Sequence, residues 1–167
     1  MIQHELRTRN GDVLFTSSLP TLAQRLESAL LNGVAFRDME LTFHDLAHVN
    51  LDGAIFQKIH FFECNLSGGN LSECRFENCA FSYCDLTDTC FCYTDFSNCV
   101  FHHNTYTETD ISEARFVDCT FRGSIYTGPK RTECYEMLRC KFEQPLVEHI
   151  SIDSLRQKII GQEKFPY

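Results

Sequence analysis

Large apolar residues recur at every fifth position through the middle of the chain. The series begins at Phe36 and continues without insertion or deletion to Tyr126, which makes 19 consecutive repeats. A period of five does not fit an α-helix, because successive repeats would rotate by about 140° and form no apolar stripe. It does not fit a straight strand either, since an odd period would turn each anchor to the opposite face. The chain is therefore expected to bend at regular intervals.

The residues between the apolar anchors indicate where each bend lies. Positions two apart point the same way on an extended chain, so the residue two before each anchor faces inward with it. These inward residues are mostly small: Ala54, Cys64, Cys74, Cys79, Cys84, Thr89, Thr94, Cys99, Ala114, Cys119 and Ser124. The other three positions are mostly polar, so each repeat reads in, out, in, out, out. The two successive outward residues predict the bend, and a chain that bends this way repeatedly winds into a coil.

Anchors that lie twenty residues apart tend to be identical. The matching columns are Phe36, Phe56, Phe76, Phe96 and Phe116; Leu46, Leu66 and Leu86; and Phe61, Phe81, Phe101 and Phe121. If identical anchors stack on one another in successive coils, one turn contains twenty residues, which is four repeats. About 4.75 coils spaced by roughly 4.8 Å would form a rod near 23 Å long.

The tandem motif resembles that of the pentapeptide-repeat family, usually A-[D/N]-L-x-x. It is seen in Cys84-Asp85-Leu86-Thr87-Asp88 and Thr109-Asp110-Ile111-Ser112-Glu113, and the resemblance covers residues 34 to 126. It implies an all-β solenoid, the right-handed four-sided β-helix. The predicted organisation is a cap over residues 1–33, the β-helix over 34–128, and a C-terminal cap or tail over 129–167.

Both ends of the coil need caps, because an open end exposes unpaired backbone groups and apolar interior. At the N-terminus, Asn10-Gly11 predicts a β-hairpin turn. Ser18-Leu19-Pro20 then predicts a helix start, with Leu19, Leu22, Leu26 and Leu30 on one face and Gly33 as the stop. This layout resembles the start of many bacterial and phage pentapeptide-repeat proteins.

Signals after Gly128-Pro129 are weaker. The sequence suggests an irregular continuation around Cys140-Lys141-Phe142 and a short helix from Asp153 to Ile160, stopped by Gly161. Both a cap on the rod and a contact with a second copy of the chain fit this helix.

The ten cysteines are interpreted as reduced thiols of a cytoplasmic protein, because no apolar leader run follows Met1. Six occupy the inward position as compact hydrophobes, whereas Cys90 and Cys92 flank Phe91 and should point outward. No metal site is expected, since no CxxC pair occurs and four ligands would have to converge. No membrane span is predicted.

The sequence does not predict an enzyme or a cofactor site. No G-x-S-x-G or phosphate-loop pattern occurs, and Phe and Leu from every side should fill the rod, leaving little room for a substrate. His44 takes an inward position, where a hydrogen-bonded structural role is expected. The net charge of −8 argues against direct binding to nucleic acid, whose phosphates attract Lys and Arg.

Two adjoining faces of the predicted rod are acidic and, within the repeats, hold no Lys or Arg. The face on Leu46 carries Asp45, Asp85, Asp88 and Glu108, and the face on Leu51 carries Asp52, Glu73, Asp110 and Glu113. A one-signed field of this kind steers basic partners. The alternative is a merely solubilising surface, because the motif itself favours Asp or Asn before the anchor.

A third face displays outward aromatic residues, Phe43, Phe62 and Tyr83. Exposed apolar patches commonly mark interfaces, although a tail folded back over them would make them core. We therefore expect a non-enzymatic module that engages a protein partner, or forms a homodimer through the aromatic face or the C-terminal segment. The alternative is an acidic DNA mimic that binds a type II topoisomerase such as DNA gyrase, an activity that the resemblance implies for some family members.

Overall fold

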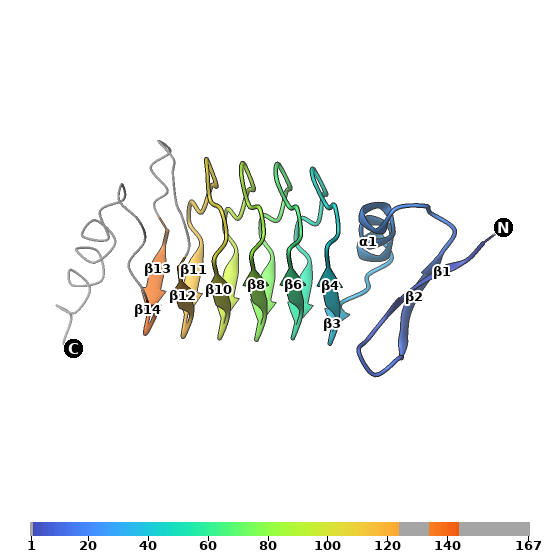
Figure 1. Cartoon of the computed structure of the whole chain (residues 1–167), viewed down its shortest axis with the longest axis horizontal. Helices are drawn as coiled ribbons and strands as arrows, with labels where there is room; N and C mark the ends of the chain where they lie inside the picture. Colours follow the sequence, from blue (N-terminus) through green and yellow to red (C-terminus); the bar gives the residue numbers. More distant parts are fainter. Residues whose placement is uncertain (1, 124–133, 144–167) are drawn as a thin grey trace.

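The computed structural model describes residues 2–123 and 134–143 as a rod of stacked coils with a hairpin and a helix at one end (Figure 1). Two parallel sheets of six strands each form two sides of the coil. The first contains β3 (Phe36–Arg37), β5 (Ile55–Gln57), β7 (Arg75–Glu77), β9 (Asp95–Ser97), β11 (Arg115–Val117) and β13 (Glu136–Leu138). The second contains β4 (Glu40–Thr42), β6 (His60–Phe62), β8 (Ala80–Ser82), β10 (Val100–His102), β12 (Thr120–Arg122) and β14 (Lys141–Glu143). Isolated bridges such as Asp45 with Asn65 join the coils on the other two sides.

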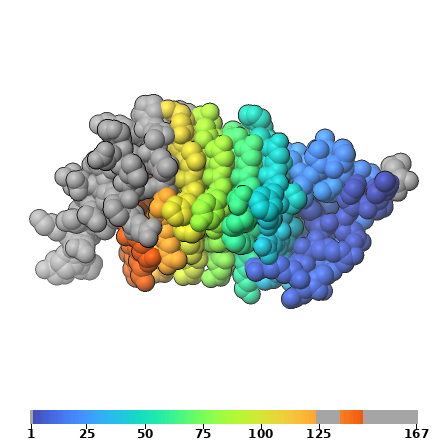
Figure 2. Space-filling model, viewed as in Figure 1, coloured from blue at the N-terminus to red at the C-terminus, as the bar shows by residue number. Residues whose placement is uncertain are grey.

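The register of the sheets confirms four repeats per turn. Phe56 pairs with Phe36 on one side and Phe76 on the other, each twenty residues away. The coils follow one another as continuous bands along the rod in the space-filling view (Figure 2).

The bends lie where the two outward residues were predicted. The residue two after each anchor has a positive φ, for example 49° at Glu63 and 56° at Tyr83. This left-handed conformation turns the chain by the same amount in every repeat. It is unusual for residues other than Gly, Asn and Asp, so composition alone did not indicate it.

Phenylalanine rings fill the interior of the coil. Phe76 stacks on Phe56 with ring centroids 4.7 Å apart and on Phe96 at 5.0 Å, and meets Phe81 of the adjoining column edge-on at 5.3 Å. All four side chains are buried. The interior is therefore a packed core, as the sequence predicted.

The small inward residues tie successive coils together. The inward Thr and Cys side chains donate to backbone carbonyl oxygens 23 residues earlier, as Thr109 does to Leu86 at 2.7 Å and Cys74 to Leu51 at 3.0 Å. The six cysteines predicted to face inward, 64, 74, 79, 84, 99 and 119, are all buried and follow this pattern. A buried thiol thus satisfies a carbonyl lone pair while packing as a small hydrophobe.

The N-terminal cap consists of β1 (His4–Arg7), antiparallel to β2 (Val13–Ser17), and α1 (Leu22–Leu31). The helix begins later than predicted. Thr21 is the N-cap and forms a capping box with Gln24, so Pro20 precedes the helix instead of occupying its first turn. The helix ends at Asn32 and Gly33, whose φ is +73°.

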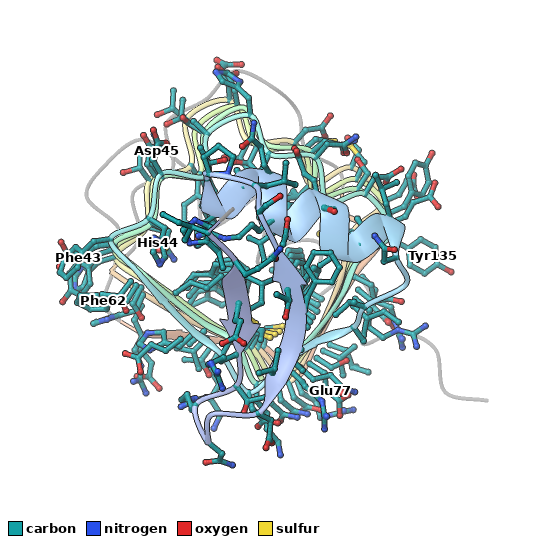
Figure 3. All side chains as sticks on the ribbon, turned by 90° about the vertical axis from the view of Figure 1, so that its right-hand side faces the viewer. Phe43, His44, Asp45, Phe62, Glu77 and Tyr135 are labelled. Carbon is teal, nitrogen blue, oxygen red and sulfur yellow. The ribbon has the colours of Figure 1, made fainter. Side chains whose placement is uncertain are left out.

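The helix α1 lies across the open end of the first coil (Figure 3). Its Glu27 carboxylate accepts the backbone N–H of Asn50 at 2.8 Å, which satisfies a donor that would otherwise have no coil to pair with. Leu26 and Ala29 are fully buried against the core. Among the described residues, no helix has the length and apolar character needed to cross a membrane.

The repeat resumes beyond residue 129. Met137 pairs with Phe116 and Phe142 with Phe121, a step of 21 residues instead of twenty, so β13 and β14 begin a sixth coil after a one-residue insertion. Phe142 stacks on Phe121 at 5.1 Å, so the chain continues around Cys140-Lys141-Phe142 with regularly paired strands, not with the irregular structure expected there. The helix predicted from Asp153 to Ile160 lies outside the described residues.

Candidate interaction surfaces

An aromatic corner, defined by Phe43, Phe62 and Tyr83, runs along one edge of the rod. Successive rings meet edge-on, with centroids 5.8 Å apart for the first pair and 5.9 Å for the second. Phe43 is 68% exposed and Tyr83 49%, while Phe62 is half-buried between them. Figure 3 shows Phe43 and Phe62 at the same corner, pointing away from the core. The three rings predicted to gather on one face therefore form one continuous ridge.

Two histidines extend the aromatic corner. Tyr83 stacks on His103 at 5.3 Å and meets His102 edge-on at 5.1 Å. The ring of His103 is held by a hydrogen bond between its Nδ1 and the carbonyl oxygen of Gly123, at 2.8 Å. Burial, together with the positive charges of His103 and Arg122, lowers the pKa of His102, so it favours the neutral form.

The sequence pattern alone did not single out His102 and His103. Tyr83 and His103 both lie two residues after an anchor and twenty apart, which is the signal that could have joined them. Phe62 and His102 lie one residue after an anchor instead. The ridge thus zigzags between two positions of the repeat, and no single column contains it.

Carboxylates of the Leu46 face have two different structural settings. Asp45 and Asp85 accept the backbone N–H two residues ahead, from Ala47 at 3.2 Å and Thr87 at 3.0 Å, and so help to shape the coil. Asp88 and Glu108 instead occupy the left-handed bend position, with φ of 54° and 56°. Asp45 lies on the same side of the rod as Phe43, at the start of the neighbouring face (Figure 3).

The Leu51 face repeats this arrangement. Asp110 accepts hydrogen bonds from the backbone N–H of Ser112 at 2.9 Å and from its hydroxyl at 2.6 Å. Asp52, Glu73 and Glu113 are exposed. The ion pairs within the described ranges lie at the hairpin and the two sheet faces, as Lys58 with Asp38 does at 3.9 Å.

Cys74 and His44 are residue types that enzymes commonly use, but both are at least half-buried in structural positions. Burial raises the pKa of Cys74 to about 12, which keeps this thiol protonated and unreactive. His44 is half-buried beneath the cap, where burial and the charge of Arg25 lower its pKa. A surface depression of about 220 Å³ is lined by Asp38, Gln57, Lys58, Glu77 and Asn78.

Within residues 2–123 and 134–143, one group of potential metal ligands gathers on the Leu51 face, at Cys90, Cys92 and Asp110. Both thiols point outward, as predicted, but they are half-buried rather than exposed. Their sulfurs lie 2.9 Å apart.

The four-sided coil, its left-handed bends and its inward Phe, Leu and Cys columns define a right-handed parallel β-helix of five-residue repeats. Residues 54–128 match the family model described as a pentapeptide repeat region, so this part of the chain is a pentapeptide-repeat β-helix. No curated protein sequence matches it.

Solved structures with a similar fold include HetL, a pentapeptide repeat protein involved in heterocyst differentiation regulation from the cyanobacterium Nostoc sp. strain PCC 7120. It aligns with a TM-score of 0.57 at 14% identity, over 61% of this chain and 44% of HetL, so the match spans less than half of HetL. Rfr23, a pentapeptide repeat protein from the cyanobacterium Cyanothece 51142, aligns with a TM-score of 0.35 at 9% identity, over 69% of this chain and 86% of that one. A trypsin-treated form of QnrB1, a plasmid-mediated fluoroquinolone resistance protein, aligns with a TM-score of 0.32 at 11% identity, over 81% of this chain and 82% of QnrB1.

Proposed function

We propose that the protein is a non-enzymatic interaction module that binds a protein partner through the aromatic corner. The observation that carries this proposal is the continuous run of outward-facing rings from Phe43 through the half-buried Phe62 to Tyr83, across neighbouring coils. Aromatic side chains bury a large area at little cost in side-chain entropy, and clusters of them are typical energetic centres of interfaces.

The packed interior supports a role without catalysis. A substrate pocket needs space among convergent polar groups, whereas stacked rings such as Phe76 and Phe81 occupy the centre of the coil. The buried thiols donate hydrogen bonds as reduced cysteines, which fits action in the cytoplasm or another reducing compartment.

The test is affinity capture from the native host with the wild type and a Phe43→Ser/Tyr83→Ser variant. We expect the variant to lose at least one partner that the wild type retains. Tyr135→Ser is the matched control, because Tyr135 is 68% exposed but lies on the side of the coil opposite Phe43 (Figure 3). Recovery of the same proteins by wild type and variant would contradict the proposal. Sedimentation of both proteins tests whether the partner is a second copy of the chain.

A second function, binding of a basic DNA-binding protein such as a type II topoisomerase, is favoured by the two acidic faces. The observation is that eight carboxylates occupy adjoining sides that lack Lys and Arg within residues 34–126. A field of one sign accelerates association with a basic surface and weakens with salt.

A DNA gyrase supercoiling assay tests this second function. Asp85→Asn, Asp88→Asn, Asp110→Asn and Glu113→Gln would be combined in one variant. The Asn substitutions keep the side-chain oxygen that accepts a backbone N–H, as Asn65 accepts that of Ser67 at 3.1 Å. We expect wild type to bind gyrase and the variant to bind less. Absence of binding by the wild type would end the DNA-mimic hypothesis.

A further inference from the structure

One coil of the Leu51 face departs from the hydrogen-bonding pattern of its neighbours. In the coil before it, the Ser72 hydroxyl donates to the side-chain oxygen of Asn70 at 2.7 Å, and in the coil after it Ser112 donates to Asp110 at 2.6 Å. Between them, Cys90 and Cys92 replace both members of this pair. The oxygen pair of the repeat thus becomes a pair of sulfurs, with the two Sγ atoms 2.9 Å apart.

The coil register adds a carboxylate to the two sulfurs. Cys90 and Asp110 form a parallel bridge, which places the Asp110 side chain next to Cys90 in the following coil. One ligand atom from each of Cys90, Cys92 and Asp110 lies within 4.8 Å of the others, and all three residues are half-buried. The Ser72 hydroxyl lies 3.1 Å from the Cys90 sulfur on the opposite side.

The electrostatics of this cluster favour a cation. The Asp110 carboxylate lies beside the two sulfurs, so a thiolate formed at Cys90 or Cys92 would be repelled by its negative charge. No Lys or Arg of residues 34–126 lies on this face or on the adjoining Leu46 face to neutralise them. A divalent ion would remove the repulsion, and its binding would release the thiol protons to solvent.

We propose that Cys90, Cys92 and Asp110 form a binding site for a thiolate-preferring divalent cation such as Zn²⁺. Two thiolates and one carboxylate are ligand types that Zn²⁺ takes, at about 2.3 Å for sulfur and about 2.0–2.2 Å for oxygen. A tetrahedral ion needs the two sulfurs further apart than 2.9 Å, so its binding requires rotation of the cysteine side chains. Three protein ligands leave a fourth position for water or for a side chain of a bound partner.

Local sequence spacing did not indicate this site, because no CxxC pair is present and four ligands do not lie close together in the sequence. Asp110 is eighteen residues from Cys92 and becomes its neighbour only through the coil. The cysteine pair occurs in this coil alone among residues 49–113 of the Leu51 face. The equivalent positions of the other coils hold Asn50 and Asp52, Asn70 and Ser72, and Asp110 and Ser112.

The test is titration of the reduced, full-length protein with Zn²⁺ by calorimetry and with Co²⁺ by absorption, which reports thiolate ligation directly. Cys90→Asn with Cys92→Ser is the informative variant, because it restores the pair found at Asn70 and Ser72 and so preserves the coil. We expect the wild type to bind one more equivalent of metal than this variant. Asp110→Asn, which keeps an acceptor for Ser112, should weaken binding about tenfold or more. Cys140→Ser, a half-buried thiol on another face, should leave the stoichiometry unchanged.

Equal stoichiometry and affinity in the wild type and the Cys90→Asn/Cys92→Ser variant would overturn the proposal. So would a Co²⁺ complex without thiolate charge-transfer absorption. Thiol counting after denaturation provides a further check: loss of two thiols to a Cys90–Cys92 disulfide in saturating Zn²⁺ would also overturn it, because a bound ion protects both sulfurs. Matching circular-dichroism spectra would establish that the variants are folded.

Discussion

The Thr94 hydroxyl donates a hydrogen bond of 2.7 Å to the backbone carbonyl oxygen of Leu71, in the coil below. Thr94 is fully buried, so water cannot replace the bond if the hydroxyl is lost. The same link recurs at Thr89 and Thr109. Inward threonines and cysteines therefore pack in the core and also link neighbouring coils, because each donates a side-chain hydrogen bond to a backbone carbonyl of the preceding coil.

Replacing Thr94 by Val should destabilise the protein by about 1 kcal/mol, because the shape is kept while one buried donor is lost. Urea unfolding measures the change. Thr105→Val is the control: Thr105 is exposed, and its substitution should alter stability by no more than about 0.5 kcal/mol. Equal losses in both variants would show that the hydroxyl of Thr94 contributes no specific link.

Truncating Phe76 should have the largest effect of the substitutions considered. Its ring is completely buried between Phe56 and Phe96, so Phe76→Ala removes two stacking contacts and leaves a cavity, at a cost of about 3–5 kcal/mol. Phe76→Leu should cost less, since Leu occupies equivalent inward positions at Leu66 and Leu86. Both are measured by denaturant unfolding; similar losses for Ala and Leu would contradict the packing argument.

A glycine at a bend should stabilise the coil, contrary to the usual effect of glycine. Glu63 is exposed and has a φ of +49°, so Glu63→Gly relieves left-handed strain and should gain roughly 0.5–1 kcal/mol after the entropic cost of glycine. The reverse change, Gly53→Ala, should lose about 1 kcal/mol, because φ is +72° and no atom lies within 4 Å of the added Cβ to compensate or clash. Thermal unfolding of both variants checks the sign, and destabilisation by Glu63→Gly would refute the explanation.

The ion pair between Asp118 and Arg139 should make attachment of the sixth coil pH-dependent. Hydrogen bonding to Arg139 lowers the pKa of Asp118, so the pair contributes stability above the ordinary pKa of an aspartate, and this contribution is lost as the pH falls through the lowered value. Asp118→Asn should therefore be less stable than wild type at pH 7, with the difference shrinking in acid and in high salt, since both groups are exposed. Urea unfolding at neutral and acidic pH measures this, and a difference that persisted below the carboxylate's range would argue against the ion pair.

The period of five, from Phe36 onward, determined much of this protein by itself. Because interior volume admits only certain side chains, the spacing of Phe, Leu and Cys specifies which residues point inward, and the twenty-residue identity of Phe56 with Phe76 specifies four repeats per turn. The outward placement of Phe43, Phe62 and Tyr83 follows from the same alternation. The alternation of inward and outward residues can be predicted from the sequence, because each buried position by itself requires an apolar or small side chain.

Only the tertiary structure decided which surface residues meet. The spacing of twenty places Asp110 in the column of Cys90 and His103 in that of Tyr83, but the contact between their exposed side chains depends on conformations that the neighbouring coils set. The extra residue before Met137 likewise shows only in the strand register. A repeating sequence thus defines its core directly, whereas its binding surfaces depend on contacts between coils.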